Sequence, residues 1–167
     1  KKYIQGKREK CLGLKQAKYW YELAVEKGES TAMNNLGYLY QHGLGTEVDL
    51  QKAFALFEKS ALANNMYACS NLAYFYDSGT YVKQDYATAY KWYLKGAELG
   101  NPNCMNMLGQ FNLNGKGRDK DYDEAAKWYK KTIEKDAKHA AAHCNLGYCY
   151  EFGYGVPKDL NKALELY

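Results

Sequence analysis

Two short segments of the sequence hold residue types that often carry out chemistry. In the first, His139 and His143 stand four residues apart, with Cys144 beside them and Asp136 upstream. That spacing puts two imidazoles on one face of a helix, as a zinc site requires, but the set of ligands is incomplete. Cys144 and His143 do not form a nucleophilic pair either, because adjacent residues of a helix point away from each other. We therefore expect no metal site here, and a packed or hydrogen-bonded His143.

The second segment, Gly115-Lys116-Gly117-Arg118, is similar to part of a phosphate-binding loop. A Walker loop also needs a Gly-Lys-Ser/Thr ending that leads from a strand into a helix, and the sequence provides neither. Glycines recur with the same spacing in Gly43-Leu44-Gly45 and in Gly153-Tyr154-Gly155, which indicates a turn between two helices. Since no acid, base and oxyanion donor converge on one place, we expect no catalytic residue and no cofactor.

The sequence around these segments repeats about every 36 residues. One phrase starts at a Leu followed by a small residue, and it occurs in steps of 36, 36 and 38 at Leu36, Leu72, Leu108 and Leu146. A second phrase starts at an Asp, with Ala four residues later and an aromatic residue eight residues later, at Asp49, Asp85, Asp121 and Asp159. Self-similarity at this period is typical of stacked arrays, which present one continuous surface to a partner.

Each unit of the repeat is expected to be a pair of short helices. Apolar residues in the first phrase fall at helical spacing, as Met33, Leu36 and Tyr40 do. Because glycine weakens a helix, Gly37 predicts close approach of the neighbouring helix. The glycine after the first phrase suits a left-handed helix end, and the Asp that follows suits the cap of the next helix. The two additional residues of the last step are expected within 134–138.

Two details of the repeat lead to further predictions. Tyr81 stands where the other units have glycine, so its turn is expected to differ from theirs in backbone if that position needs a positive φ. Trp20, Trp92 and Trp128 recur at one position of the second helices. We expect these tryptophans to pack neighbouring units together.

The repeat also predicts how the chain is divided. We expect a single solenoid fragment over residues 1–167, with a partial repeat at 1–30, repeats at 31–66, 67–102 and 103–140, and a truncated repeat at 141–167. Apolar residues at the two ends of the array predict self-association through the end helices.

Composition limits the classes of partner. The net charge is +4 with acids and bases interspersed, so we expect no nucleic acid as partner. No run of about 18 apolar residues is present, so we expect no direct membrane insertion in this window. The five cysteines occupy unlike positions of the repeat, which favours a reducing, cytoplasmic compartment.

The two phrases, L-G-x-x-Y-x-x-G-x-G and D-x-x-K-A-x-x-W-Y-x-K, resemble Sel1-like repeats, which are related to tetratricopeptide repeats. The agreement is clearest over residues 146–163 and 90–97. The resemblance implies an all-α fold, a right-handed α/α solenoid of antiparallel helix pairs, that serves as a non-catalytic scaffold or adaptor. The alternative is a regulatory domain of a larger enzyme or of a signalling or quality-control complex. The cysteine-rich bacterial branch of the family joins each helix pair with a disulfide, and this sequence lacks that paired pattern.

In the related tetratricopeptide arrays, the first helix of each unit lines a concave groove that binds a peptide or a partner helix. Carried onto this sequence, that geometry predicts a groove lined by Asn34, Asn35, Tyr38, Asn71, Tyr74, Asn106, Gln110, Asn145 and Tyr148. An Asn amide can bond both the N–H and the C=O of an extended peptide, and Tyr adds contact area at little cost in entropy. The alternative is that these amides make hydrogen bonds between helices, as buried amides require.

Overall fold

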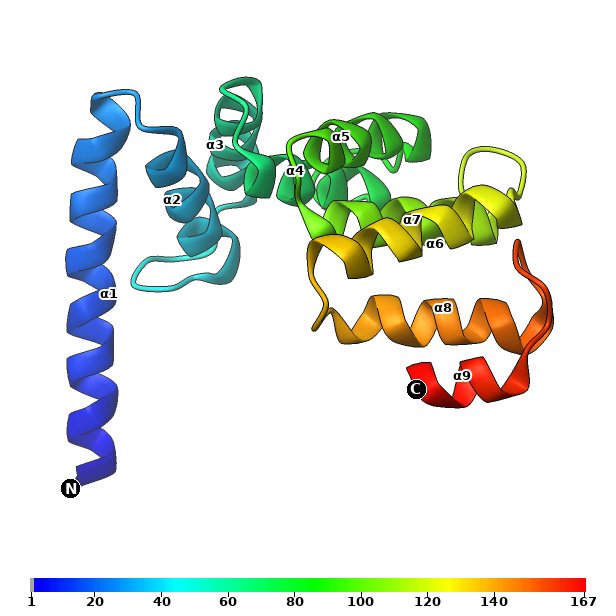
Figure 1. Ribbon diagram of the computed structural model, residues 1–167. Helices are drawn as coiled ribbons and strands as arrows, with labels where there is room; N and C mark the ends of the chain where they lie inside the picture. Colours follow the sequence, from blue (N-terminus) through cyan, green and yellow to red (C-terminus); the bar gives the residue numbers. More distant parts are fainter. Residues whose placement is uncertain (1) are drawn as a thin grey trace.

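The structure, a computed structural model, describes residues 2–167, with side chains from Leu12 onward. In that part of the chain every regular element is a helix, which confirms the expected all-α solenoid (Figure 1). The helices are α1 (Lys2–Glu26), α2 (Ser30–His42), α3 (Leu50–Leu62), α4 (Met66–Ser78), α5 (Tyr86–Glu98), α6 (Pro102–Asn114), α7 (Tyr122–Lys135), α8 (Ala140–Phe152) and α9 (Leu160–Leu166).

The ends of these helices are set by the repeated glycine and aspartate. The helices α2, α4, α6 and α8 each end at a glycine with a left-handed backbone, with φ of 64°, 71°, 69° and 74° at Gly43, Gly79, Gly115 and Gly153. The helices α3, α5, α7 and α9 each begin after an aspartate whose carboxylate accepts a backbone N–H three residues on, at Asp49, Asp85, Asp121 and Asp159. Both signals were predicted, and both act locally in the chain.

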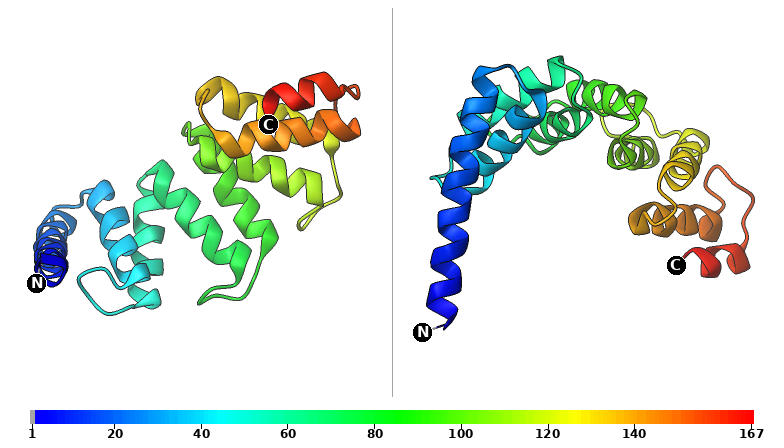
Figure 2. Two further views of the ribbon diagram at one scale, coloured as in Figure 1. Left: turned by 90° about the horizontal axis from the view of Figure 1, so that it is seen from below. Right: turned by 60° about the vertical axis from the view of Figure 1, so that its left-hand side comes forward.

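The helices stack in chain order, and each contacts chiefly its neighbours in the sequence. Together they follow an arch whose two ends point to the same side (Figure 2, right). Short helices such as these are marginal alone, so their stability depends on burying residues such as Phe57 and Tyr129 between pairs. The helical glycines allow this packing, because a Cβ on Gly37 would lie 2.9 Å from the Phe57 ring. Close approach at this glycine was predicted.

The two additional residues of the third unit are divided between a helix and a connection. Helix α7 has 14 residues, whereas α3 and α5 have 13. The connection to α8 takes residues 136–139, whereas the connection from α5 to α6 takes only 99–101. The predicted placement near residues 134–138 is therefore confirmed.

One backbone prediction was wrong. Tyr81 has a φ of 68°, close to the values of 70°, 66° and 64° at Gly45, Gly117 and Gly155. Its turn therefore has the same backbone as theirs. The Tyr81 ring lies 5.6 Å from the ring of Phe54, a contact that helps to hold this non-glycine residue in the left-handed region.

The prediction for the tryptophans holds for two of the three. Trp92 is partly buried and packs against two hydrophobic cores, that of its own unit and that of the preceding unit. Trp128 packs against the core formed by the preceding helices α4, α5 and α6. Trp20 on α1 was expected to be packed in the same way, but it is 65% exposed. The difference follows from its place, because no helix of the described chain precedes α1 for it to pack against.

Candidate functional site

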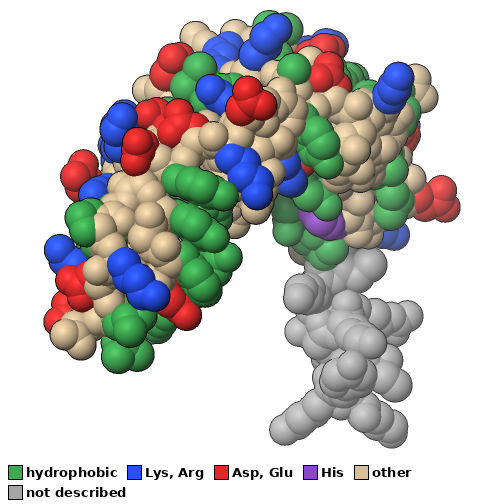
Figure 3. Space-filling view, turned by 90° about the vertical axis from the view of Figure 1, so that its right-hand side faces the viewer, with side chains coloured by type: hydrophobic (Ala, Val, Ile, Leu, Met, Phe, Trp, Pro, Cys, Tyr) green, Lys and Arg blue, Asp and Glu red, His purple; other side chains and the backbone are tan. Residues whose placement is uncertain are grey.

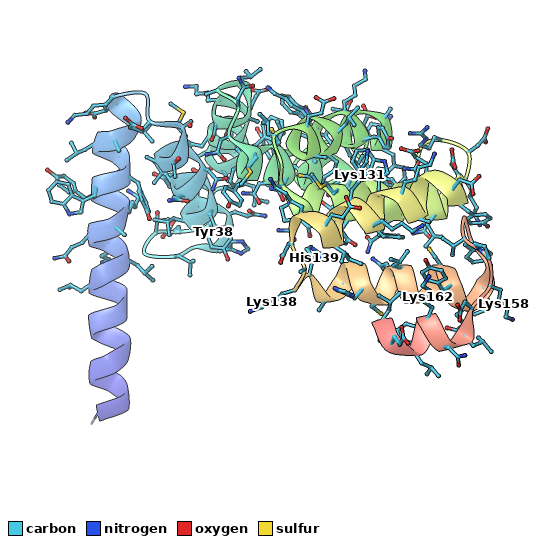
Figure 4. The ribbon with its side chains drawn as sticks, in the orientation of Figure 1. Tyr38, Lys131, Lys138, His139, Lys158 and Lys162 are labelled. Carbon is cyan, nitrogen blue, oxygen red and sulfur yellow. The ribbon has the colours of Figure 1, made fainter. Side chains whose placement is uncertain are left out.

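An open groove of about 420 Å³ crosses the first helices of three successive units. Its walls come from α2, from α4 and from the start of α6, and they carry no Asp, Glu, Lys, Arg or His. Tyr38 lies on the lower side of α2 in Figure 4, the side toward which both ends of the arch point. The residues that line the groove are Thr31, Asn34, Asn35, Tyr38, Tyr67, Ser70, Asn71, Asn101 and Asn103.

The side-chain amides of Asn71, Asn34 and Asn35 form a chain of two hydrogen bonds in this groove, here called the amide relay. Asn71 donates from Nδ2 to Asn34 Oδ1 at 2.9 Å, and Asn34 donates from Nδ2 to Asn35 Oδ1 at 3.3 Å. Asn34 is only 8% exposed, so the relay satisfies an amide that would otherwise be buried without partners. Within the described part of the chain, the relay leaves Asn35 Nδ2 as a donor and Asn71 Oδ1 as an acceptor without a protein partner.

Two aromatic rings flank the relay and remain accessible. Tyr38 is 47% exposed and Tyr67 is 52% exposed. The Tyr38 ring lies 4.2 Å from the ring of His42, which orients it. The groove therefore combines flat apolar area with side-chain hydroxyls and with the free donor and free acceptor of the relay.

At the start of α6 the groove is lined by two asparagine side chains that make hydrogen bonds within the fold. Asn101 is fully buried, caps α6 through its Oδ1, and donates from Nδ2 to the Met66 carbonyl at 2.9 Å. Asn103 Oδ1 lies 3.0 Å from His139 Nε2 and so links α6 to α8. Both amides fix the spacing of the helices, and Asn101 is too deeply buried to contact a ligand, whereas Asn103 is exposed.

Of the predicted groove residues, Asn34, Asn35, Tyr38 and Asn71 lie together in this groove. Tyr74 is half exposed on α4, and Gln110 is half-buried on α6, but neither lines it. Asn145 donates from Nδ2 to Asn106 Oδ1 at 3.0 Å, which makes a second amide pair between α6 and α8. The alternative of helix-to-helix hydrogen bonds is thus correct for both pairs.

Tyr148 belongs to a separate cluster of aromatic residues at the end of α8. Its ring lies 4.7 Å from that of Phe152, and Tyr154 stacks on Tyr122 at 4.3 Å. In Figure 3, hydrophobic side chains gather along the inner side of the limb that faces the viewer. The ring contacts of Tyr148 with Phe152 and Tyr154 place it in an aromatic cluster that does not line the groove of α2 and α4.

Sequence reasoning missed four residues that line the groove, namely Thr31, Tyr67, Asn101 and Asn103. A signal for three of them was present. Thr31 precedes Asn35 by four residues, Tyr67 precedes Asn71 by four, and Asn103 precedes Asn106 by three, so each lies about one turn earlier on a helix face already predicted to line the groove.

The histidines considered as metal ligands make hydrogen bonds within the fold, and the cysteines of the core are buried. His139 Nδ1 accepts the Ala142 N–H and caps α8, and His143 Nε2 bonds the Ala137 carbonyl at 3.0 Å. Residues 12–167 contain no cluster of three or more side chains suited to bind a metal ion. Burial raises the pKa of the Cys104 thiol to about 12 and that of Cys149 to about 11, which suits core packing and not nucleophilic attack.

Several lysines of the second helices have partners within the fold. Lys52 pairs with Asp49 at 3.0 Å, and Lys131, labelled in Figure 4, lies 4.5 Å from the Trp128 ring. Lys95 donates to the Ala61 carbonyl of the preceding unit. In residues 2–167, no helix is both long enough and apolar enough to cross a membrane.

The family model of the Sel1 repeat matches five segments of the chain, residues 14–29, 30–65, 67–101, 102–136 and 140–167. A search of curated proteins finds none that matches. The crystal structure of a Sel1 repeat protein from Oxalobacter formigenes is 35% identical, with a TM-score of 0.85 over 91% of this chain and 61% of that one.

Two further solved structures are similar. A protective antigen of uropathogenic Escherichia coli is 32% identical, with a TM-score of 0.83 over 91% of this chain and 32% of that one. Cysteine-rich protein B of Helicobacter pylori is 27% identical, with a TM-score of 0.60 over 75% of this chain and 90% of that one. The chain thus spans less than two thirds of the first two relatives. Its own described cysteines, Cys69, Cys104, Cys144 and Cys149, are free.

Proposed function

The chain belongs to the Sel1 repeat family, and we propose that it is a non-catalytic adaptor that binds an extended peptide segment of a partner protein in the groove of α2, α4 and α6. Proteins of this family generally serve as scaffolds for protein interactions. The single observation that supports the groove is the amide relay, which ends in one free donor and one free acceptor between two exposed tyrosines.

The free groups of the relay match the polar groups of a peptide backbone. An extended peptide presents N–H and C=O groups in alternation, and each needs a partner when it leaves water. Asn35 Nδ2 would donate to a peptide carbonyl, and Asn71 Oδ1 would accept from a peptide N–H. Because Asn34 holds both amides in place, little side-chain entropy is lost on binding.

The tyrosines would select the side chains of the peptide. Tyr38 and Tyr67 offer apolar faces with polar edges, and the groove carries no formal charge. We therefore expect uncharged segments with apolar or aromatic side chains to bind more tightly than strongly acidic or basic ones.

A displayed library of random peptides tests this proposal. Peptides selected on the chain should bind the triple variant Asn35→Ala, Tyr38→Ala, Tyr67→Ala at least about tenfold more weakly, which corresponds to about 1.4 kcal/mol. The three side chains are at least partly exposed, so the variant should fold, as circular dichroism would show. Tyr19→Ala on α1 is the matched control, because Tyr19 is equally exposed and lies outside the groove. Selected peptides that bind the triple variant as tightly as the parent would refute the groove.

A further inference from the structure

The turn between α6 and α7 differs from the equivalent turns of the other units by a cationic side chain. At the position after Gly45, Tyr81, Gly117 and Gly155, the first unit has Thr46, the second has Val82, which packs against the core, and the fourth has the buried Val156. The third unit has Arg118 at that position, and its side chain is exposed. A charge at a position that is uncharged in the other three units marks Arg118 as a candidate functional residue.

A pocket of about 240 Å³ opens between this turn and the first turns of α5. Gly117 allows the turn to approach α5, since a Cβ on it would lie 2.7 Å from the Cβ of Tyr86. Three cationic side chains and two tyrosines surround the space. The lining residues are Tyr86, Ala87, Tyr90, Lys91, Lys116, Gly117 and Arg118.

The tyrosines hold two of the cations in place. The Arg118 guanidinium lies 4.6 Å from the centre of the Tyr90 ring, and Lys116 Nζ lies 5.4 Å from that of Tyr86. A guanidinium stacked on a ring keeps the N–H groups at its edge free, and these match the paired oxygens of an oxyanion. The pocket is therefore organised before any ligand enters.

Carboxylates of the fold neutralise only part of this charge. Lys116 pairs with Asp77 at 2.8 Å, and Asp77 is nearly buried. Asp85 is engaged at the start of α5, where it accepts from the N–H and the hydroxyl of Thr88. Asp119, next to Arg118, is exposed. Within residues 12–167, neither Lys91 nor Arg118 forms an ion pair.

We propose that this pocket binds a phosphomonoester group. Two cations without ion-pair partners, Lys91 and Arg118, match the charge of about −2 that such a group carries near neutral pH. Arginine binds phosphate through two parallel hydrogen bonds, which gives the site its geometry. The residues of this pocket are distinct from those of the peptide groove, so the inference goes beyond the proposed function and does not depend on it.

Titration of the chain followed by the amide resonances of Ala87 and Gly117 tests the site. The probes are N-acetyl-O-phosphoserine amide, inorganic phosphate and N-acetylserine amide. Both phosphate probes are expected to shift these resonances, and the unphosphorylated probe is not. Binding of the phosphoserine probe at least as tight as that of inorganic phosphate would support a phosphomonoester, whereas tighter binding of inorganic phosphate would assign the site to the free ion and overturn the proposal. Absence of any shift with both phosphate probes would overturn the proposal.

The variants use residues that the repeat itself supplies. Arg118→Val introduces the residue of Val82 and Val156, and Lys91→Ala introduces that of Ala55, so both variants should fold. Each is expected to weaken phosphate binding at least about tenfold, or about 1.4 kcal/mol. Lys127→Ala, at the position of Lys91 in the next unit, should leave binding unchanged. Binding that persists in both pocket variants would overturn the proposal. The triple variant of the peptide groove should retain phosphate binding, so the two proposals fail separately.

Discussion

Asn71 on α4 donates a hydrogen bond from Nδ2 to Oδ1 of Asn34 on α2 at 2.9 Å, and this bond joins the first helices of two successive units. The pair recurs between Asn145 and Asn106 at 3.0 Å. At the joint between them the corresponding residues are Ser70 and Met107, which cannot form an amide pair. Hydrogen-bonded amide pairs therefore connect the first helices at two of the three contacts between successive units, α2 with α4 and α6 with α8.

We expect the Asn34–Asn71 bond to contribute measurably to stability. Asn71→Ala removes the donor and leaves the nearly buried Asn34 Oδ1 without its partner, which should lower the free energy of unfolding by about 1 kcal/mol. A double-mutant cycle with Asn34→Ala, followed by urea unfolding, measures the coupling between the two residues. A coupling near zero would show that water replaces the bond at no cost.

Tyr129 carries a hydroxyl that is buried without a hydrogen-bond partner in the described structure. Phe57 occupies the same position of the repeat in the first unit, so the ring alone suffices for packing. Tyr129→Phe is expected to raise the free energy of unfolding by about 1 kcal/mol, because it removes an uncompensated polar group from the core. Chemical denaturation provides the measurement.

The matched control for Tyr129 is Tyr167, at the same position in the last unit. Its hydroxyl donates to Glu151 Oε2 at 2.6 Å, and the side chain is exposed. Tyr167→Phe should therefore give no gain in stability. If Tyr129→Phe instead destabilised the chain, the Tyr129 hydroxyl would have a partner in solution.

Alkaline pH is expected to destabilise the fold through its buried thiols. Burial raises the pKa of Cys104 to about 12 and that of Cys149 to about 11, from an ordinary value near 9. Above pH 9 the unfolded chain loses these protons first, so stability is retained below pH 9 and falls as the pH rises toward 11 to 12. Melting temperatures measured from pH 7 to 11 should show this decline.

A variant separates the thiols from other alkaline effects. Cys104→Ala places at this position the residue that Ala32, Ala68 and Ala142 provide in the other units, so the fold should persist. The variant should lose less stability between pH 9 and pH 11 than the parent does. An unchanged pH profile would show that Cys104 ionises in the folded chain as readily as in the unfolded one.

The fold could be predicted because its signals are local. The glycine after each first helix and the aspartate before each second helix act through their own backbone, so their types and spacing determine the helix ends. The backbone at Tyr81 could not be predicted in this way, because its left-handed conformation is set by the turn as a whole and not by the preference of tyrosine.

The groove was harder to predict for a geometric reason. Comparing units aligns equivalent positions, such as Asn34 with Ser70, but the hydrogen bond of Asn34 is made with Asn71, one residue beyond that equivalent. Helical spacing identified the face that carries the amides. It could not show which amides bond to each other and which remain free, because that depends on the offset between stacked helices.

The turn between α8 and α9 contains two glycines that are required for different reasons, one for its left-handed backbone alone and the other also for close packing. Gly153 and Gly155 have similar φ values, 74° and 64°, but different surroundings. A Cβ on Gly153 would make ordinary contact at 3.5 Å, whereas one on Gly155 would collide with the carbonyl oxygen of Tyr122. Gly153→Ala should therefore cost only the left-handed strain, about 1 to 2 kcal/mol.

Gly155→Ala must add to that strain a displacement of the turn from α7, because a backbone atom cannot give way as a flexible side chain does. We expect it to lower the free energy of unfolding by about 3 kcal/mol or more, within the range of backbone strain combined with overpacking. Urea unfolding of the two variants side by side makes the comparison. Equal losses would mean that the turn before α9 does not pack closely on α7 in solution, and that left-handed backbone alone explains both glycines.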